Sequence, residues 1–332
     1  MRWLEWLPQD PTRLIGGVET HVLSMARCLR AKGVQVEFSS DPAVLFDGGG
    51  FDIVRTHGDL LPKGYLWKVR PGPYRIHTLH GSALGQMKGL GETHRARHWK
   101  AFYREWSACV RADLVAGVHS DLELYRLTKR LGHAVVDMHN GWNASDGTEE
   151  LPLGVESRLA GRWAFVGRGW DPVKGGDRVL AALERDPSLE LVVVPGDGLP
   201  DHPRILKTGR LSAAQIRMLL RRCAGLLLPS RFEGFALVLL EALAEGVPVV
   251  ATRVGGNASV ERCDPRGLHW FQDPNDPELF LADLRRALDL DSAAQTQSRS
   301  EWNRAHLWSW EQCTDLLLDA VIKGRESAIR RE

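Results

Sequence analysis

Hydrophobic and polar positions in the first half of the chain follow two alternating periods. Short apolar or alternating runs predict strands over 2–7, 34–38, 51–54, 74–79, 112–118 and 134–138, although Arg2 and Glu5 interrupt the first of these. Between the runs, apolar residues recur at helical spacing. One helix begins after Gly16-Gly17 and ends at Gly33, and another covers 93–111. Strands that alternate with helices are typical of a parallel, doubly wound α/β sheet.

The same pattern restarts after a polar stretch from Asn143 to Glu150, which is the best candidate for a linker. Strands are predicted over 162–167, 190–194, 204–207, 225–228 and 247–251, and an amphipathic helix over about 309–323. A length of 332 residues is enough for two hydrophobic cores. The sequence therefore predicts two Rossmann-like domains, over 1–146 and 147–308, and a C-terminal helical segment over 309–332.

Two carboxylates, Glu233 and Glu241, follow the strand at 225–228. A strand, a loop and a helix start form the usual ligand edge of an open α/β sheet, because the helix N-terminus offers free N–H groups and a partial positive charge. An anionic ligand, such as a phosphate, is therefore predicted. Eight helical residues rise roughly 12 Å, more than the roughly 5–9 Å between paired carboxyls of glycoside hydrolases. The two glutamates are expected to hold different parts of one extended ligand; two solvated glutamates on an ordinary strand–helix unit are the alternative.

Five segments, in the same order, resemble the retaining family-4 glycosyltransferases of the GT-B fold. The segment from Glu233 to Glu241 is similar to their sugar-nucleotide motif, and the other matching segments are Gly16–His21, Phe165–Arg168 with Lys174–Gly176, Gly209–Leu211 and Gly246–Thr252. The resemblance spans nearly the whole chain. It implies an α/β fold of two Rossmann-like, doubly wound domains that face each other across a cleft. It also implies that the final helix crosses back to the first domain.

The resemblance assigns parts of a nucleotide sugar to residues of the second domain. Glu233 would bond hydroxyls of the transferred sugar, and Glu241 would accept hydrogen bonds from the ribose. The backbone N–H groups around the helix start would face the phosphate and sugar, and a loop further upstream would border the base; these residues are Phe235, Ala236 and Leu237, and Gly209 with Arg210. Ala236 replaces the glycine or proline expected at its position, a change that leaves backbone contacts open.

Two cationic residues, Arg168 and Lys174, follow the strand at 162–167. Arginine forks onto phosphate oxygens and lysine supplies a point charge. In the resembling family, such a pair would stabilise the negative charge of a leaving nucleoside diphosphate, in place of a metal ion. Without the family context, two solvated basic residues beside a loop would be the favoured interpretation, and the resemblance reverses that preference.

Two further positions belong to the first domain. Gly16 and Gly17 would let the backbone approach the donor pyrophosphate or the acceptor, although a tight turn explains them as well. His80 lies just past the strand at 74–79, and the Thr-Leu-His-Gly pattern resembles a family segment whose histidine contacts the transferred sugar. Because His77 and His80 are an odd number of residues apart, they face opposite ways on a strand. We expect His80 to be the functional one, with a structural role as the alternative.

The helix over 93–111 carries two features of lower weight. His94 and His98 have a spacing that can bind zinc, but no third ligand is evident, so no metal site is predicted. Its apolar residues are Trp99, Phe102, Tyr103, Trp106 and Val110, and its basic residues include Arg95, Arg97, Lys100 and Arg104. We expect the aromatic face to pack in the core and the basic face to be solvated; peripheral contact with an anionic membrane or an acidic acceptor is the alternative.

Composition limits the cellular setting and the partners. The formal net charge is +1, which is no signature of polyanion binding. The five cysteines are scattered and form no Cys-x-x-Cys pair, which favours reduced thiols in a cytoplasmic protein. No run of residues is long and apolar enough to span a membrane, and Glu5 and Pro8 make the N-terminal segment a poor signal peptide.

The predicted function is a metal-independent, retaining hexosyltransferase that uses a nucleoside diphosphate sugar as donor and needs no further cofactor. A UDP-sugar is the first expectation for the donor and a GDP-sugar the second. Three alternatives stay open: a sugar-nucleotide epimerase of the same fold, a non-catalytic sugar or nucleotide binder, and, for the acceptor alone, a nucleic acid base. The acceptor itself cannot be predicted from this chain.

Overall fold

The computed structural model describes residues 1–13, 16–59, 61–91, 96–143, 149–167, 171–197 and 201–329. The chain forms two compact units, one of Met1–Gly141 with Trp308–Glu332 and the other of Trp142–Leu307. The boundary predicted between residues 146 and 147 falls in 144–148, outside the described residues. The second division lies between Leu307 and Trp308, one residue before the predicted position.

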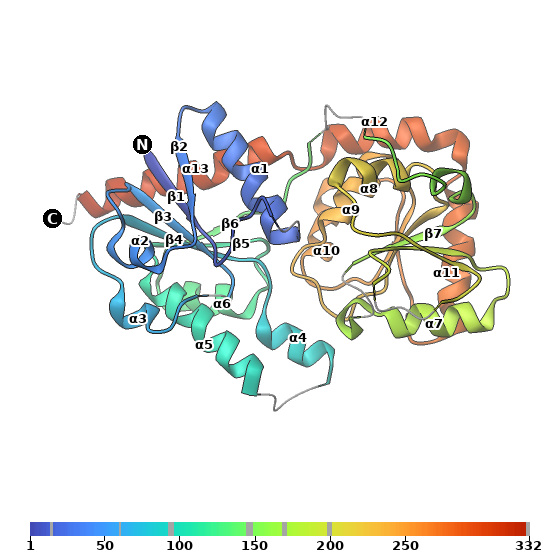
Figure 1. The fold of residues 1–332 in the computed structure, drawn as a ribbon, viewed down its shortest axis with the longest axis horizontal. Helices are drawn as coiled ribbons and strands as arrows, with labels where there is room; N and C mark the ends of the chain where they lie inside the picture. Colours follow the sequence, from blue (N-terminus) through green and yellow to red (C-terminus); the bar gives the residue numbers. More distant parts are fainter. Residues whose placement is uncertain are drawn as a thin grey trace. The chain divides into compact units, whose positions relative to one another are not determined.

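The N-terminal unit is built on a parallel sheet whose described strands run in the order β2-β1-β3-β4-β5-β6. The strands are β1 (Arg2–Trp6), β2 (Gln35–Ser39), β3 (Ile53–His57), β4 (Tyr74–Leu79), β5 (Leu114–Gly117) and β6 (Val135–Asp137). The helices are α1 (Gly17–Ala31), α2 (Pro42–Asp47), α3 (Tyr65–Lys68), α4 (Ala83–Gly89), α5 (Ala96–Arg111), α6 (Glu123–Arg130) and α13 (Trp310–Ile329). Figure 1 shows helices on both faces of this sheet.

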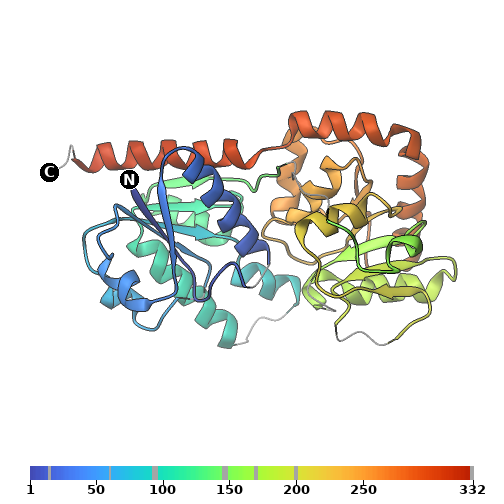
Figure 2. The ribbon, with the colours of Figure 1, turned by 45° about the horizontal axis from the view of Figure 1, so that its top comes forward.

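One face of this sheet is covered by α1 and the C-terminal helix. Helix α1 buries Val22, Met25 and Leu29, and α13 lies beside it in both views (Figures 1 and 2). The Thr314 hydroxyl donates to Met25 Sδ at 3.3 Å, and Lys32 pairs with Asp315 at 2.8 Å. The end of the chain therefore belongs to the N-terminal unit. On the other face, an apolar cluster that includes Leu4, Val54, Leu45, Tyr65 and Ala108 joins the sheet to α2, α3 and α5.

The C-terminal unit repeats this architecture, with described strands in the order β12-β11-β10-β7-β8-β9, all parallel. The strands are β7 (Trp163–Val166), β8 (Leu191–Val194), β9 (Ile205–Lys207), β10 (Gly225–Leu228), β11 (Val249–Ala251) and β12 (Leu268–Trp270). The α-helices are α7 (Gly176–Arg185), α8 (Ala213–Leu220), α9 (Leu237–Ala244), α10 (Gly256–Ser259), α11 (Pro277–Leu290) and α12 (Thr296–His306). Helices α7 and α11 cover one face, where Phe165, Val179, Phe280 and Leu284 form the core.

The two parallel sheets confirm the predicted α/β architecture of two Rossmann-like, doubly wound units. Each predicted strand is present with bounds shifted by a few residues. The prediction missed β12, a short, half-buried strand with His269 at its centre, whose pattern is too weak to distinguish it from a loop. Helix α5 differs from expectation in its packing, because Trp99, Tyr103 and Val110 are exposed.

The buried face of α5 is made instead of small and polar residues, among them Glu105, Ser107, Ala108 and Cys109. Small side chains let the helix backbone approach its neighbours closely, and this compensates for the loss of aromatic packing. Burial raises the pKa of Glu105 to about 8, and the nearby carboxylates of Asp59 and Glu123 add to the effect.

Candidate functional site

The C-terminal sheet changes its winding direction between β7 and β10. From this pair, β8 and β9 extend to one side and β11 and β12 to the other. In open α/β sheets, ligands bind outside the carboxyl ends of the strands at such a switch point. The segments that follow these two strands, 167–175 and 229–236, contain five of the nine residues that the sequence singled out in this unit.

The two loops are joined by backbone and charged contacts. Gly175 adopts a positive φ of 77°, and a Cβ atom there would lie 2.1 Å from the carbonyl oxygen of Pro229, so only glycine fits. Arg231 donates its backbone N–H to the Val173 carbonyl at 2.7 Å. Its guanidinium donates two hydrogen bonds, of 2.7 and 2.6 Å, to the Asp177 carboxylate. These bonds lower the pKa of Asp177. The loops therefore form one supported surface at the switch point.

Lys174 and Glu233 meet on this surface. The Lys174 ammonium donates to both carboxylate oxygens of Glu233 at 2.8 Å, and the Ser230 hydroxyl donates to Glu233 Oε1 at 2.7 Å. The Glu233 side chain is 5% exposed and that of Lys174 is 25% exposed, so the cation is the more accessible end of the pair. We call Lys174, Ser230 and Glu233 the switch-point cluster.

The backbone beneath Glu233 is fixed from the other side. Gly255 has a positive φ of 52°, and a Cβ atom there would lie 1.8 Å from the Glu233 carbonyl oxygen. The segment between β11 and α10 therefore packs directly against the loop that carries Glu233. Such close packing favours a carboxylate that keeps one position before any ligand arrives.

Helix α9 begins immediately after this loop. Ala236 is the extended residue before the helix, and its N–H donates to Asn257 Oδ1 at 3.2 Å. Of the three amides predicted to face a phosphate, that of Ala236 is therefore already occupied. Leu237 and Val238 lie in the first turn of α9, where helix N–H groups have no partner within the helix. Phe235 is buried beside them.

Glu241 lies about one turn into α9 and is partly buried among apolar neighbours. Glu233 lies in the loop before the helix, so the roughly 12 Å expected from eight helical residues does not hold. Burial raises its pKa to about 7; the positive charge of Arg217 opposes the shift and the carboxylate of Glu245 adds to it. Within the described ranges, no hydrogen-bond partner meets the Glu241 carboxylate. A half-buried carboxylate with vacant acceptor positions is suited to a ligand that brings hydroxyl donors.

The remaining predicted residues of this unit fall in different places. Arg168 lies outside the described residues. Gly209 and Arg210 are exposed, just past β9, which is two strands away from β7 in the sheet. Neighbouring strands are about 4.8 Å apart, so these residues lie about 10 Å along the edge from the β7 loop. That distance requires an extended ligand if one molecule is to touch both.

The N-terminal sheet has its own switch point, between β1 and β3. Gly16 precedes α1 in an extended conformation, with φ at −133°, and no side chain caps the helix. Gly17 is the first residue of this 15-residue helix, whose first-turn N–H groups have no partner within the helix. Both glycines are exposed, but the Glu19 carboxylate of the first turn lies against Gly16, where a Cβ atom would be 2.7 Å from Glu19 Oε2, so an anion would have to displace it.

His80 lies at the carboxyl end of β4, beside a group of polar side chains that sequence reasoning missed. We call the group the buried polar cluster; its members are Glu5, His21, Arg55, His57, His80 and Asn140. Glu5 and Arg55 are fully buried and 3.4 Å apart. His57 Nε2 lies 2.7 Å from Glu5 Oε2, and His57 Nδ1 lies 2.9 Å from His80 Nε2. His80 is the partly exposed member that ends this chain of hydrogen bonds.

No group of three possible metal ligands occurs among the residues that the structure describes. Of the two histidines with zinc-like spacing, His94 falls outside those residues, and His98 is buried with its Nδ1 atom unpartnered there. Over the same described ranges, no helix combines the length and apolar character needed to cross a bilayer.

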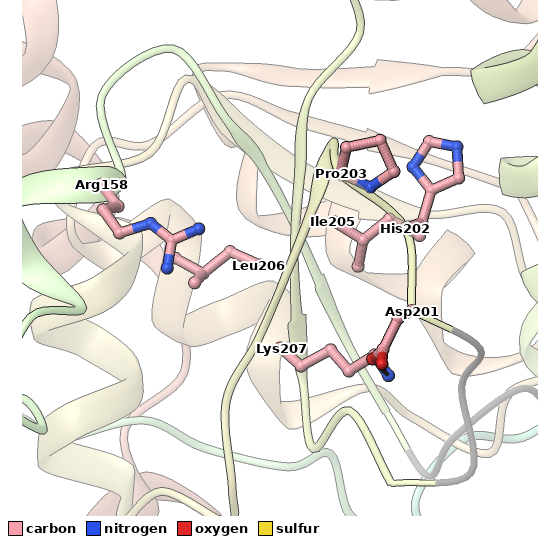
Figure 3. Close-up of a pocket in the computed structure, with 7 residues that line it drawn as sticks. All are labelled: Arg158, Asp201, His202, Pro203, Ile205, Leu206 and Lys207. Atoms are coloured by element: carbon pink, nitrogen blue, oxygen red, sulfur yellow. Dashed lines mark hydrogen bonds and ion pairs between the residues drawn. The ribbon is translucent and has the colours of Figure 1, made fainter.

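Two surface pockets lie away from the carboxyl ends of the strands at the two switch points. One, of about 420 Å³, is lined by Arg158, by residues 201–203 before β9 and by β9 itself; Figure 3 shows Lys207 and Asp201 meeting beside it, and the two side chains are 2.6 Å apart. The other, of about 580 Å³, is lined chiefly by residues that precede β3 and β4, together with Arg111 and Arg325. Because open α/β sheets bind ligands at the carboxyl ends of their strands, we favour the switch-point cluster over either pocket.

Comparison with known proteins identifies a family for the C-terminal unit. A family model described as glycosyl transferases group 1 matches residues 161–289, which contain the switch-point cluster and Glu241. A relative, the D-inositol 3-phosphate glycosyltransferase of Salinispora arenicola (strain CNS-205), is 36% identical over 344 residues, which cover 92% of this chain and 75% of the relative.

Two solved structures share the fold over both units. Sucrose-phosphate synthase from Thermosynechococcus elongatus has a TM-score of 0.74 at 15% identity, covering 99% of this chain and 100% of that one. The Anabaena protein HepE, solved in complex with UDP-glucose, has a TM-score of 0.65 at 15% identity, covering 97% of this chain and 100% of that one. At such identities the likeness concerns the fold alone, and it confirms the GT-B class.

Proposed function

This chain belongs to the group 1 glycosyltransferases, and we propose that it transfers a hexose from a nucleoside diphosphate sugar with retention of configuration and without a metal ion. The observation that carries the proposal is the Lys174–Glu233 pair at the carboxyl edge between β7 and β10. A UDP-sugar is the favoured donor, since a protein of the same fold binds UDP-glucose. A GDP-sugar is the second candidate.

The ion pair supplies both functions that such a donor needs. Lys174 is the accessible end of the pair, and a diphosphate beside it would compete with Glu233 for the ammonium. Release of Lys174 exposes acceptor positions on Glu233, which Ser230 continues to hold in place, and sugar hydroxyls would occupy them. As the glycosidic bond breaks, Lys174 and the first-turn N–H groups of α9 stabilise the negative charge of the leaving group.

The ribose is assigned to Glu241. Glu241 lies about one turn into α9, and Glu233 lies in the loop before that helix. Because the two carboxylates belong to different elements, we assign them to different parts of the donor. A nucleotide sugar that runs from Glu233 through its diphosphate to Glu241 would meet the vacant acceptors of the second carboxylate with two ribose hydroxyls. Gly209 and Arg210, further along the edge, are assigned to the base.

The acceptor is assigned to the N-terminal unit, around Gly16, Gly17 and His80, although the resemblance gives His80 to the transferred sugar. A relative that is 36% identical is named for D-inositol 3-phosphate, so inositol phosphate is the first acceptor to test. Its phosphate would suit the exposed start of α1, and its hydroxyls would suit His80. We assign no general base: the leaving phosphate takes the proton of the attacking hydroxyl.

The experiment is a transfer assay with UDP-, GDP- and ADP-sugars against a panel that contains inositol phosphate, other polyols, sugars and nucleosides. Transfer with one donor class is expected. Epimerised donor in the absence of any acceptor would indicate the alternative epimerase. Binding without turnover of any donor would indicate a non-catalytic protein, and transfer to nucleosides alone would indicate a nucleic acid base as acceptor.

Variants separate catalysis from stability at the switch-point cluster. Lys174→Met should lower turnover at least about 10²-fold, the scale of one lost transition-state donor. It should also destabilise the fold, because it leaves Glu233 buried without its cation. The double variant Lys174→Met/Glu233→Gln removes that unpaired charge, so it should regain stability and stay inactive. Full activity in the double variant would refute the assignment.

Substitutions of the two carboxylates should affect different properties of the protein. Glu241→Ala should weaken the binding of free nucleoside diphosphate, measured by calorimetry, because its partner is the ribose. Glu233→Gln should leave that affinity nearly unchanged and lose transfer, because its partner exists only in the complete donor. Equal weakening of free diphosphate binding by both variants would contradict the division between them.

A further inference from the structure

The buried polar cluster of the N-terminal unit fixes the direction of its hydrogen bonds. A guanidinium only donates, so Arg55, whose Nη2 lies 3.0 Å from His21 Nε2, requires that nitrogen to be an acceptor. The proton of neutral His21 is then on Nδ1, which lies 2.8 Å from the Oδ1 atom of Asn140, an acceptor. Every donor in this branch meets an acceptor, which supports the orientation of the whole cluster.

The second branch starts from the carboxylate of Glu5. Its Oε1 atom accepts from Trp3 Nε1 at 3.0 Å and from Arg55 Nη1 at 3.4 Å, and its Oε2 atom lies 2.7 Å from His57 Nε2. Burial by itself raises the pKa of Glu5, but Arg55 and His57 outweigh it and hold the pKa below its ordinary value. The carboxylate is therefore ionised, accepts only, and places the proton of His57 on Nε2.

The imidazole rings of His57 and His80 continue this hydrogen-bond chain to the surface. Burial lowers the pKa of both His57 and His80, so both rings are neutral near pH 7. Neutral His57 with its proton on Nε2 has a bare Nδ1, which can only accept from His80 Nε2 at 2.9 Å. His80 is then left with an unprotonated Nδ1. Among the described residues, no partner meets that atom.

We propose that Glu5 is a positioning residue that fixes the tautomers of His57 and His80, so that His80 presents a bare Nδ1 lone pair at the carboxyl edge of the N-terminal sheet and accepts a hydrogen bond from a substrate hydroxyl. The substrate half of this inference rests on the proposed glycosyl transfer, because that reaction supplies a sugar or polyol. The tautomer half rests on the hydrogen-bond chain alone.

The chain also predicts how the tautomers can be reversed. In Glu5→Gln, the amide oxygen should take the Oε1 position, where Trp3 and Arg55 both donate, and the amide NH₂ should take the Oε2 position. That group donates to His57 Nε2, which moves the proton of His57 to Nδ1. His57 then donates to His80 Nε2, and the proton of His80 moves to Nδ1. A change at Glu5 thus converts His80 from an acceptor into a donor without touching it.

The first test is nitrogen-15 NMR of the histidine rings in the full chain at pH 7.5, assigned with His57→Asn and His80→Asn. Both rings are expected in the form with a protonated Nε2 and a bare Nδ1. A protonated Nδ1 on either ring of the wild-type protein would overturn the proposal, and this measurement needs no variant at Glu5. In Glu5→Gln both rings should switch tautomer. Trp3→Phe, the matched control, leaves the bond between Glu5 and His57 and should switch neither.

The second test is transfer by the same proteins. Glu5→Gln should lower kcat/KM at least about tenfold, since a donor then faces the substrate hydroxyl, and Trp3→Phe should change it less than about threefold. With a panel of monodeoxy substrates, the analogue that lacks the contacted hydroxyl should be used equally by wild type and Glu5→Gln. Unchanged kcat/KM in Glu5→Gln with switched tautomers would overturn the positioning role. Absence of any transfer by the wild-type protein would instead overturn the proposed function, and NMR would still decide the tautomers.

Discussion

Affinity for a nucleoside diphosphate should depend on the protonation of Glu241. Burial raises the pKa of this carboxyl from 4.5 to about 7, so it titrates within the working range of most enzymes. The ionised carboxyl is an acceptor only and bonds the two ribose hydroxyls most strongly, whereas protonation removes its charge and makes one oxygen a donor. The apparent affinity should therefore follow the fraction of Glu241 that is ionised.

The size of the effect follows from that pKa. About nine tenths of the carboxyl is ionised at pH 8 and about one tenth at pH 6. The dissociation constant of the nucleotide should therefore rise about tenfold as the pH falls from 8 to 6. Binding at pH 7 should release about half a proton for each nucleotide bound, because binding draws Glu241 into its ionised form. A carboxyl with its ordinary pKa would stay ionised over this range and show neither effect.

Calorimetry with UDP at pH 6, 7 and 8, in two buffers of different ionisation enthalpy, measures both quantities. Glu241→Gln keeps the size of the side chain and one acceptor oxygen but cannot titrate. The phosphates of UDP ionise in the same way with both proteins, so dividing the dissociation constant of the wild type by that of the variant cancels their contribution. Glu278→Gln, at an exposed carboxyl on α11, is the matched control and should keep the tenfold dependence. An equal tenfold change in Glu241→Gln would refute the reasoning.

Three further outcomes are expected. Activity should survive EDTA, because Lys174 and helix N-termini are assigned the work of a metal; loss on chelation with rescue by Mg²⁺ or Mn²⁺ would contradict this. The product should keep the anomeric configuration of the donor, as read by proton NMR, and an inverted product would exclude the proposed mechanism. Because burial raises the pKa of Glu105 to about 8, the unfolded chain loses this proton first, and wild-type stability should fall as pH rises from about 4.5 to about 8. Glu105→Gln should remove that slope and gain up to about 5 kcal/mol over wild type at pH 9 by denaturant unfolding; parallel pH profiles would show that Glu105 is not the cause.

The fold was predictable because its signals are local. Apolar runs such as Leu226–Leu228 and Val249–Ala251 are strands that the sheet buries on both faces, and such strands read as continuous hydrophobic segments. Helix α5 shows where this reasoning fails. Aromatic residues at helical spacing predicted the buried face, but Trp99 and Tyr103 are exposed and small residues face inward. Periodicity identifies the helix, and tertiary packing chooses which face it buries.

The candidate site was predictable only in part, for a related reason. Lys174 and Glu233 were found through motifs, and the structure places them in contact. The buried polar cluster was missed because its members are far apart in sequence: 50 residues separate Glu5 from Arg55 and 52 separate it from His57. Glu5 and Arg2 both seemed to interrupt the first strand, yet only Glu5 is buried. A buried charge is recognisable once its partner is known, and Arg55, directly after the apolar pair Ile53-Val54, was the available signal.

The two carboxyl edges differ in what they offer to a ligand. At the C-terminal edge, Lys174 and Glu233 together carry no net charge. The cation is the more exposed of the two, and the start of α9 adds a partial positive charge. At the N-terminal edge, Glu5 and Arg55 cancel fully inside the protein, and what reaches the surface is a neutral imidazole, His80. We therefore expect an anionic group beside Lys174 at the first edge and a hydroxyl beside His80 at the second. This difference supports the proposed assignment of the diphosphate to the C-terminal unit and of a hydroxyl-bearing group to His80.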